Sequence, residues 1–297
     1  NPHPLWSRGL GDVYKRQVQD GRMGVWAILT ENPDAVEPKW SQSRRIANGV
    51  MLNKPTVLKN GDWLLPVGLW RDNTNVPNVK FDAEELAPYT IEMLTHDLGD
   101  ERGSNVYRST DQGKSFKRIG QVRIPGTRVD EHMVVERGDG SLWMLLRNTG
   151  GIAQSVSTDG GRTWSDGSLY LKGRMFGNKR FFIRRLKSGA LLMVRNNSPD
   201  GKRSHMTAFV SDDDGATWQG GLLLDERESS YPDGIQAEDG TLFIIYDHQR
   251  YTLNRAGERG VGSVQIAVFS EEDVRVGKPM SDEVRLKIDV TRLRKMP

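Results

Sequence analysis

The 297-residue sequence contains no cysteine. It therefore has no disulfide bond, no thiol nucleophile and no cysteine-ligated metal, and it leaves the redox compartment open. Long apolar runs are missing too, since no stretch approaches the ~20 residues that a membrane-spanning helix needs. We therefore expect no membrane span.

The sequence also lacks a large excess of charge of either sign. The sequence has 42 Lys and Arg against 39 Asp and Glu, a net charge of +3, and the two signs are interspersed. Basic residues gather only at the very end, at Arg292, Arg294 and Lys295. Because a clustered basic surface is typical of nucleic-acid binding, we expect no nucleic-acid partner.

The first residues carry neither an initiating Met nor the charged and apolar order of a signal peptide. The stretch 11–17 (GDVYKRQ) looks like translated adapter sequence. We therefore expect residues 1–17 to be a non-native leader and residues 18–297 to form one domain. The native start, with any signal for the periplasm or for secretion, is then expected to be missing.

One motif, S-x-D-x-G-x-[ST]-[WF], occurs three times, at residues 109–116, 157–164 and 211–218. Its Asp and hydroxyl residues can hydrogen-bond the backbone of their own turn, its Gly can adopt a positive φ, and its aromatic residue can be buried. These properties indicate a structural clamp on a hairpin and not a catalytic device. The motif glycines Gly113, Gly161 and Gly215 are 48 and 54 residues apart, a period typical of propellers with ~40–50 residues per blade.

A second repeated feature is an apolar strand, a polar turn ending in glycine, and another apolar strand. It occurs at 52–68, 131–148, 180–196 and 231–247, with turn glycines Gly61, Gly140, Gly189 and Gly240. These segments are typical of β-hairpins. With a third strand, a clamp and a fourth strand, each hairpin completes a four-stranded blade. At ~50 residues per blade, we predict an all-β, six-bladed β-propeller with a truncated first blade, and we place Asp289–Met296 outside the repeat.

The open ends of these hairpins are expected to ring one mouth of the propeller. Nine residues before the turn glycines stand Leu52, Glu131, Arg180 and Tyr231, and seven after them stand Gly68, Arg147, Asn196 and Asp247. Further candidates close to this register or on the next strand are Lys54, His132, Arg203, His205, Asp233 and Arg250. Arginine suits the bidentate capture of a carboxylate or sulfate. A Glu beside a Tyr, or an Asp across a gap, can supply a nucleophile and an acid/base pair.

Structural alternatives stand beside these interpretations. A single Arg at a strand end can form a salt bridge between blades, and His132 and His205 can be structural histidines, because neither has metal-ligand spacing. The motif residues Asp111, Asp159 and Asp213 are expected to act only in the clamps. The shared register of Glu131, Arg180 and Tyr231 is what favours a functional role.

The clamps resemble Asp boxes, and over residues 23–280 the chain is similar to the sialidase-like, BNR-repeat propeller family. The stretches DEHMVVE, RFFIRRLKSG, SHMTAFVSDDDGATW and YPDGIQAEDGTLFIIYD carry this resemblance. It implies a Tyr nucleophile, a recognised exception among glycosidases, so Tyr231 would be the nucleophile and Glu131 its assisting base. Asp233 or Asp247 would be the acid, and Arg147, Arg180 and Arg250 would clamp the sugar carboxylate, with Lys54 and His205 as further substrate contacts. The Arg-Ile-Pro motif that such enzymes carry in their first blade stands here at residues 123–125, after a clamp.

The resemblance thus implies an exo-acting glycoside hydrolase for a terminal, carboxylated sugar such as sialic acid. This chemistry requires no cofactor, its partner is a glycan or oligosaccharide, and the protein is expected to be a monomer. Two alternatives remain open at this stage. One is a propeller lyase or another exo-glycosidase, with His132 or His205 as base and Tyr231 as acid; the other is a non-catalytic carbohydrate-binding propeller.

Overall fold

The computed structural model describes residues 24–69, 98–127, 131–249 and 262–292, and these form antiparallel sheets that follow one another along the chain. The first sheet has two strands, β1 (Val25–Ala27) and β2 (Arg44–Ala47). The next holds β3 (Thr56–Val57), β4 (Trp63–Leu69), β5 (Gly103–Ser109) and β6 (Lys117–Val122), preceded at β5 by the short 3-10 helix η3 (Gly99–Glu101).

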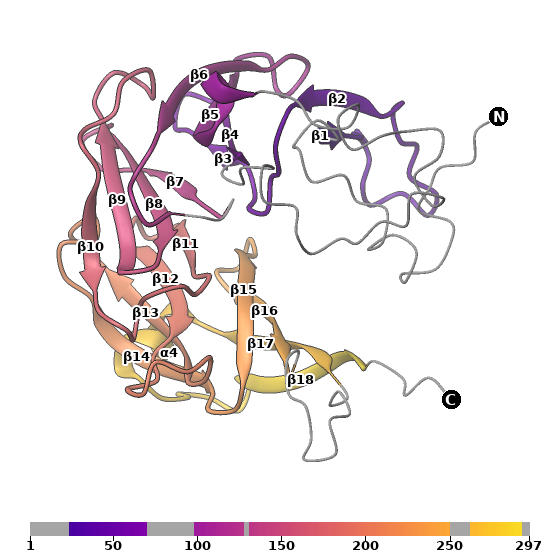
Figure 1. Ribbon diagram of the computed structural model, residues 1–297. Coiled ribbons are helices and arrows are strands. Elements are labelled where there is room, and N and C mark those ends of the chain that lie inside the picture. Colours follow the sequence, from indigo (N-terminus) through magenta and orange to yellow (C-terminus); the bar gives the residue numbers. More distant parts are fainter. Residues whose placement is uncertain (1–23, 70–97, 128–130, 250–261, 293–297) are drawn as a thin grey trace, which may run out of the picture.

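Three further four-stranded sheets follow. Their strands are β7 (Met133–Glu136), β8 (Leu142–Asn148), β9 (Gly151–Ser157) and β10 (Ser168–Lys172); β11 (Phe182–Arg185), β12 (Leu191–Asn196), β13 (Met206–Ser211) and β14 (Gln219–Asp225); and β15 (Ser229–Gln236), β16 (Leu242–His248), β17 (Ser263–Phe269) and β18 (Arg285–Arg292). Figure 1 shows the sheets arranged along a curve, with β3, β7, β11 and β15 on its inner side. This is the arrangement of propeller blades.

The all-β propeller prediction is confirmed, but the number of blades is wrong. The described residues form four four-stranded blades and one two-stranded sheet, not six blades. Dividing the length by a repeat period assumed that every residue belongs to a repeat. Strands β4 and β5 pair with each other although 33 residues, 70–102, separate them in the sequence, and β16 and β17 pair across residues 249–262, so the spacing between paired strands is not uniform.

The C-terminal prediction is also wrong, because residues 289–292 belong to β18, the outer strand of the last blade. The predicted leader, residues 1–17, lies outside the described residues. Between β17 and β18 stands α4 (Glu271–Val276), where Ser270 and Asp273 form a reciprocal capping box and Gly277 ends the helix at φ 79°. This blade thus has a capped helix where the three preceding blades have an Asp box.

All four predicted hairpins are present and share one turn geometry. In each, the turn glycine has a φ between 83° and 94° and donates its N–H to the carbonyl three residues earlier, as Gly140 does to Arg137. The residue that supplies this carbonyl also donates its own N–H across the turn, as Arg137 does to the carbonyl of Ser141 at 2.8 Å. A side chain at the glycine would be strained at this φ. The repeated glycine therefore sets the register between the first two strands of every blade.

The three clamps have the internal hydrogen bonds that their residue types predict. In the second, Ser157 Oγ and Thr163 Oγ1 donate to Asp159 at 2.8 and 2.7 Å, and the N–H of Gly161 donates to Ser157 Oγ at 2.8 Å. Hydrogen bonds from the Thr163 backbone and hydroxyl and from Ser157 hold the pKa of Asp159 well below its usual range. These carboxylates are occupied within their own turns, as expected for clamps.

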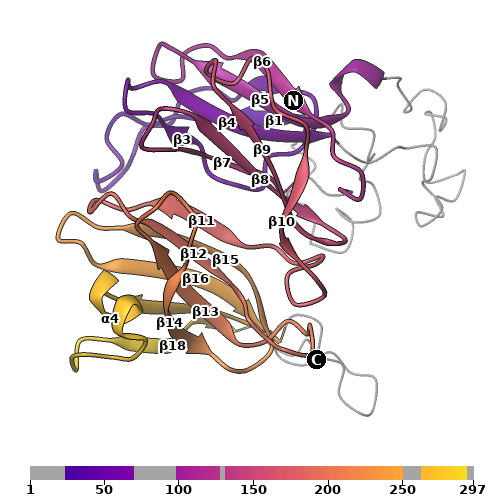
Figure 2. The ribbon, with the colours of Figure 1, turned by 90° about the vertical axis from the view of Figure 1, so that its left-hand side faces the viewer.

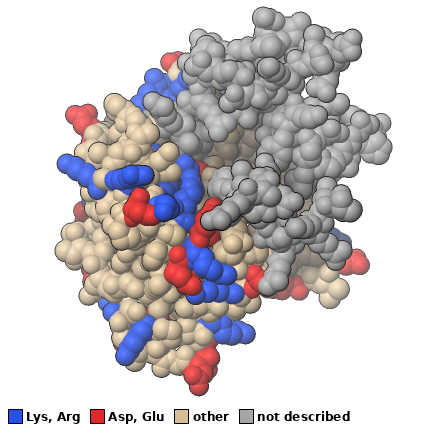
Figure 3. All heavy atoms as spheres, turned by 60° about the horizontal axis from the view of Figure 1, so that its bottom comes forward, with Lys and Arg blue, Asp and Glu red and all other residues tan. Residues whose placement is uncertain are grey.

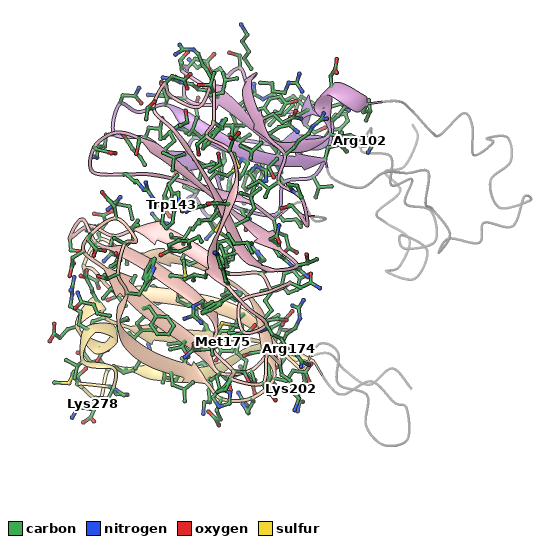
Figure 4. The ribbon with its side chains drawn as sticks, turned by 60° about the vertical axis from the view of Figure 1, so that its left-hand side comes forward. Arg102, Trp143, Arg174, Met175, Lys202 and Lys278 are labelled. Carbon is green, nitrogen blue, oxygen red and sulfur yellow. The ribbon has the colours of Figure 1, made fainter. Side chains whose placement is uncertain are left out.

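The clamps also connect neighbouring blades. A Cβ on Gly215 would lie 2.5 Å from the ring of Trp143, so glycine lets the third clamp lie directly on a tryptophan of the preceding blade. Trp143 is fully buried and packs edge-to-face on Tyr170 at a centroid distance of 5.0 Å. Figure 2 shows the sheets stacked face to face, and Figure 4 places Trp143 between them. The main core therefore lies between blades.

Two further properties of the described part of the chain bear on function. None of its helices is long and apolar enough to cross a membrane. Its His, Asp and Glu side chains form no group of three suited to hold a metal ion. Figure 3 shows Lys and Arg alternating with Asp and Glu over the visible described surface.

Candidate active site

The predicted ring positions meet at Arg180, which comes just before β11. This side chain is buried, at 7% exposure. Its Nε and Nη2 donate to Asn53 Oδ1 at 3.1 and 2.6 Å, and Nη2 also donates to the carbonyl of Leu52 at 2.9 Å. Arg180 thus joins the inner ends of two blades, because its partner Asn53 stands 127 residues earlier in the sequence.

Acidic groups surround this guanidinium. Its Nη2 lies 3.7 Å from Asp233 Oδ2. Burial lowers the pKa of Arg180, and the opposing charges come, in order of size, from Asp233, Glu131, Tyr231 and Asp247. These four are the predicted acid, base and nucleophile candidates. Of these four, Asp233 and the Tyr231 ring lie against the guanidinium, at 3.7 and 5.7 Å, and Glu131 and Asp247 act on the same arginine through their charge.

Tyr231 lies in a distortion of β15. Ser230 pairs with Asp247 and Asp233 with Ile245, so the register shifts between them and Tyr231 bulges out of the ladder. Its φ is 54°, in the left-handed region, and it precedes a proline, which disfavours helical conformations at the residue before it. Such bulges and strained residues concentrate at functional sites, where they redirect a side chain.

Two arginines flank the ring that this bulge presents. The guanidinium carbons of Arg180 and Arg203 each lie 5.7 Å from the Tyr231 ring centroid. Cations at this distance are attracted to the ring face. Two positive charges therefore lie against this one ring. Arg203 comes from the β12–β13 loop, so a third segment of the chain contributes to the site.

Glu131 and Arg147 form a buried ion pair beside this centre. Arg147 Nη1 donates to Glu131 Oε2 at 2.6 Å, and the two residues are 8% and 3% exposed. Arg147 Nη2 donates to Asn178 Oδ1 at 3.2 Å. The hairpin register predicted this proximity, because both residues stand at the open end of the same hairpin. Arg147 therefore holds Glu131 in place and is itself anchored by Asn178.

The remaining carboxylates and Lys54 occupy the same mouth. Lys54 Nζ lies 3.2 Å from Asp233 Oδ1 and donates to the Gly234 carbonyl at 3.0 Å. Ser230 Oγ donates to Asp247 Oδ1 at 2.6 Å. Asp233 and Asp247 therefore lie on either side of the Tyr231 bulge, on β15 and β16.

Two predicted residues lie apart from this cluster. The side chain of His132 enters the core and donates from Nε2 to the carbonyl of Asn105 at 2.9 Å. His205 is exposed, and its Nδ1 lies 3.0 Å from Ser204 Oγ. Arg250, the third arginine of the predicted clamp, lies outside the described residues.

The structure also adds residues that the sequence reasoning missed. Asn53 holds Arg180, Asn178 holds Arg147, and Ser230 holds Asp247. Asn53 stands one position after Leu52, within the ring register, so its place could have drawn attention. Asn178 lies between blades, where the repeat offers no register, and nothing in the pattern marked it.

The environment of His132 predicts a pH dependence of stability. A carbonyl can only accept, so Nε2 carries the proton, and among the described residues Nδ1 has no hydrogen-bond partner. Burial lowers the pKa of His132 to about 4. Protonation is thus easier in the unfolded chain, and the stabilisation is complete above the unfolded pKa of about 6.5 and is lost as the pH falls towards about 4. We expect the free energy of unfolding to fall by up to about 3 kcal/mol over this window, at about 1.4 kcal/mol per pKa unit.

Urea unfolding at several pH values in this window tests that expectation. The exposed His205→Gln variant should follow the wild-type curve, whereas His132→Gln should show a flatter dependence on pH. Equal slopes in all three proteins would contradict a buried, neutral His132.

The fold and this mouth define the class of the protein as a BNR-type β-propeller with an arginine-rich site. The sequence profile described as the BNR repeat-like domain matches residues 22–244, three quarters of the chain, and the chain belongs to this family. A search of the curated proteins finds no match.

Solved structures show the same sialidase-like propeller fold. The chain is similar to the NanB sialidase from Streptococcus pneumoniae, with 17% identity and a TM-score of 0.57, over 79% of this chain and 34% of that one. It is equally similar to the intramolecular trans-sialidase from Ruminococcus gnavus, with 17% identity and a TM-score of 0.57, over 84% and 50%. The leech intramolecular trans-sialidase gives 17% and 0.55, over 83% and 36%. The chain thus spans half or less of the length of these relatives.

Proposed function

We propose that the protein is an exo-acting glycoside hydrolase that removes a terminal, carboxylated sugar, with sialic acid as the first candidate. The observation that carries this proposal is the strained Tyr231, presented by a bulge between two arginines and among three carboxylates. The sialidase-like fold supports it, because the structures compared above are named as sialidases and trans-sialidases.

In this proposal Arg180 and Arg203 hold the sugar carboxylate, since guanidinium groups bind carboxylates with two parallel hydrogen bonds. The Tyr231 oxygen attacks the anomeric carbon, while Glu131 assists by taking up the phenolic proton. Asp233 or Asp247 protonates the leaving oxygen and later activates the water that releases the sugar. Arg147 keeps Glu131 oriented throughout.

The test is sugar release from a panel of fluorogenic α-sialosides, β-glucuronides and neutral β-glucosides. We expect release from one acidic glycoside and none from the neutral one. Arg180→Met should abolish release, and Arg162→Met, which removes an exposed arginine of the second clamp, should leave it unchanged.

Two other outcomes would overturn the proposal, and a third would change its mechanism. An unsaturated product that absorbs ultraviolet light would indicate a lyase. Glycan binding without turnover by the folded protein would indicate a carbohydrate-binding propeller. Activity that survives Arg180→Met would remove the carboxylate clamp from the mechanism.

A further inference from the structure

A hollow of about 690 Å³ opens next to the candidate active site. It is lined by residues 177–179, residues 201–204 and Glu228. Two of its lining residues belong to the site already described, because Arg203 flanks Tyr231 and Asn178 anchors Arg147. The hollow therefore adjoins the Tyr231 site, with Arg203 between them.

The walls of the hollow are tightly joined loops. Arg203 Nη2 donates to the carbonyl of Asn178 at 3.4 Å, and the N–H of Ser229 donates to the carbonyl of Arg203 at 2.9 Å. A Cβ on Gly201 would lie 2.7 Å from the Arg174 side chain, so the two loops meet where only glycine fits without displacement. Figure 4 places Arg174, Met175 and Lys202 together at this end of the sheets. The hollow is thus formed by packed backbone segments from two blades.

The charge of the lining is unbalanced. Its lining holds three cations, Lys179, Lys202 and Arg203, and one acid, Glu228. Asp200, just outside the lining, pairs with Lys202 at 2.8 Å. Lys179 is buried at 7% exposure, and its Nζ donates to the carbonyls of Met175 and Arg174 at 2.7 and 3.3 Å. Burial, followed by the positive charge of Arg203, lowers the pKa of Lys179. An anion in the hollow would relieve this repulsion between cations.

The direction of the hollow follows from the burial of its residues. Arg203, which the hollow shares with the Tyr231 site, is half-buried, whereas Lys202 at the other end is exposed, with its side chain 79% accessible. An exo-acting enzyme binds the terminal sugar at the closed end of its site, and the rest of the substrate extends towards solvent. The basic hollow lies where the next sugar would be.

We propose that this hollow binds the second sugar of the substrate and that this sugar carries a carboxylate or sulfate of its own. The substrate class would then be an oligosaccharide with negative charge on two successive sugars. This inference rests on the proposed function, since it takes Tyr231 as the point of cleavage.

The test compares matched substrates that differ only in charge on the second sugar. The probes are a sialic acid dimer against sialyllactose, and a glucuronate-terminated chondroitin tetrasaccharide with and without sulfate on its hexosamine. We expect the doubly charged member of one pair to have a kcat/KM about tenfold higher. Because Lys202 is exposed, this preference should shrink as salt rises to ~1 M, where the screening length falls to ~3 Å.

Two lysine variants localise the effect. Lys202→Glu should remove the preference for the doubly charged substrate and leave turnover of a simple fluorogenic glycoside unchanged. Lys278→Glu is the matched control, because Lys278 is an exposed lysine at the opposite end of the sheets in Figure 4. An equal kcat/KM for both members of each pair, or a preference that survives Lys202→Glu, would overturn the inference.

Calorimetric binding of the same probes to Tyr231→Phe separates this inference from the proposed function. Tighter binding of a doubly charged probe that is lost in Lys202→Glu supports the hollow even if no glycoside is cleaved. Cleavage of simple acidic glycosides without any such preference would support the proposed function and refute the binding of a charged second sugar in the hollow.

Discussion

Replacing Tyr231 with phenylalanine is expected to reduce kcat on the acidic glycoside by at least about a thousandfold. The substitution removes one oxygen atom, the nucleophile in the proposed mechanism, and keeps the ring between Arg180 and Arg203. Binding of the sugar carboxylate should therefore persist, so that KM changes little while kcat collapses. Steady-state kinetics with the fluorogenic substrate measures both constants.

Tyr107→Phe provides the matched control, because it removes the same atom from a buried tyrosine in the core cluster near β4 and β5. Its kinetics should equal those of the wild type. If Tyr231→Phe keeps more than about a tenth of the wild-type kcat, the tyrosine is not the nucleophile. A direct attack by water, assisted by one of the carboxylates, would then replace the covalent route.

Arg147→Met is expected to lower the free energy of unfolding by about 3–5 kcal/mol. The reason is Glu131, which is 3% exposed and would keep its negative charge in the interior without the guanidinium that contacts it at 2.6 Å. Removing both charges in the double variant Arg147→Met, Glu131→Gln should restore most of the loss. Urea unfolding of the wild type, both single variants and the double variant measures the coupling between the two residues.

If Arg147→Met yields no folded protein, the double variant still tests the prediction. Recovery of folded protein on adding Glu131→Gln would show that the unpaired charge of Glu131 causes the destabilisation. Two losses that simply add, with a coupling below about 0.5 kcal/mol, would contradict a stabilising contact between the two side chains.

The parts of the fold that were predicted from sequence depend on local chemistry. Each hairpin needs a glycine at positive φ, and each clamp closes through side chains within a few residues, so both leave patterns that can be counted. The hairpin register likewise placed Glu131 beside Arg147. The number of blades could not be obtained this way. It was calculated from the chain length and one repeat period, and the spacing between paired strands differs from blade to blade.

The rest of the site depends on contacts between blades. Asn53 and Asn178 act on arginines that come from other hairpins, and no spacing within the chain encodes such a contact. The bulge at Tyr231 was not predicted from the sequence, for a different reason. Two residues of β15, Tyr231 and Pro232, stand opposite one residue of β16, Tyr246, whereas the hairpin predicted there included no such irregularity.

The bond between Arg180 and Asn53 has a consequence for folding kinetics. Each hairpin can close early, because its partners are neighbours in the sequence, but this bond joins segments 127 residues apart and must await the docking of blades. Closure of the hairpins and formation of a competent site are therefore separate events in time. During refolding, activity should return after the far-ultraviolet circular dichroism of the strands, because the site forms only when the blades dock around Arg180.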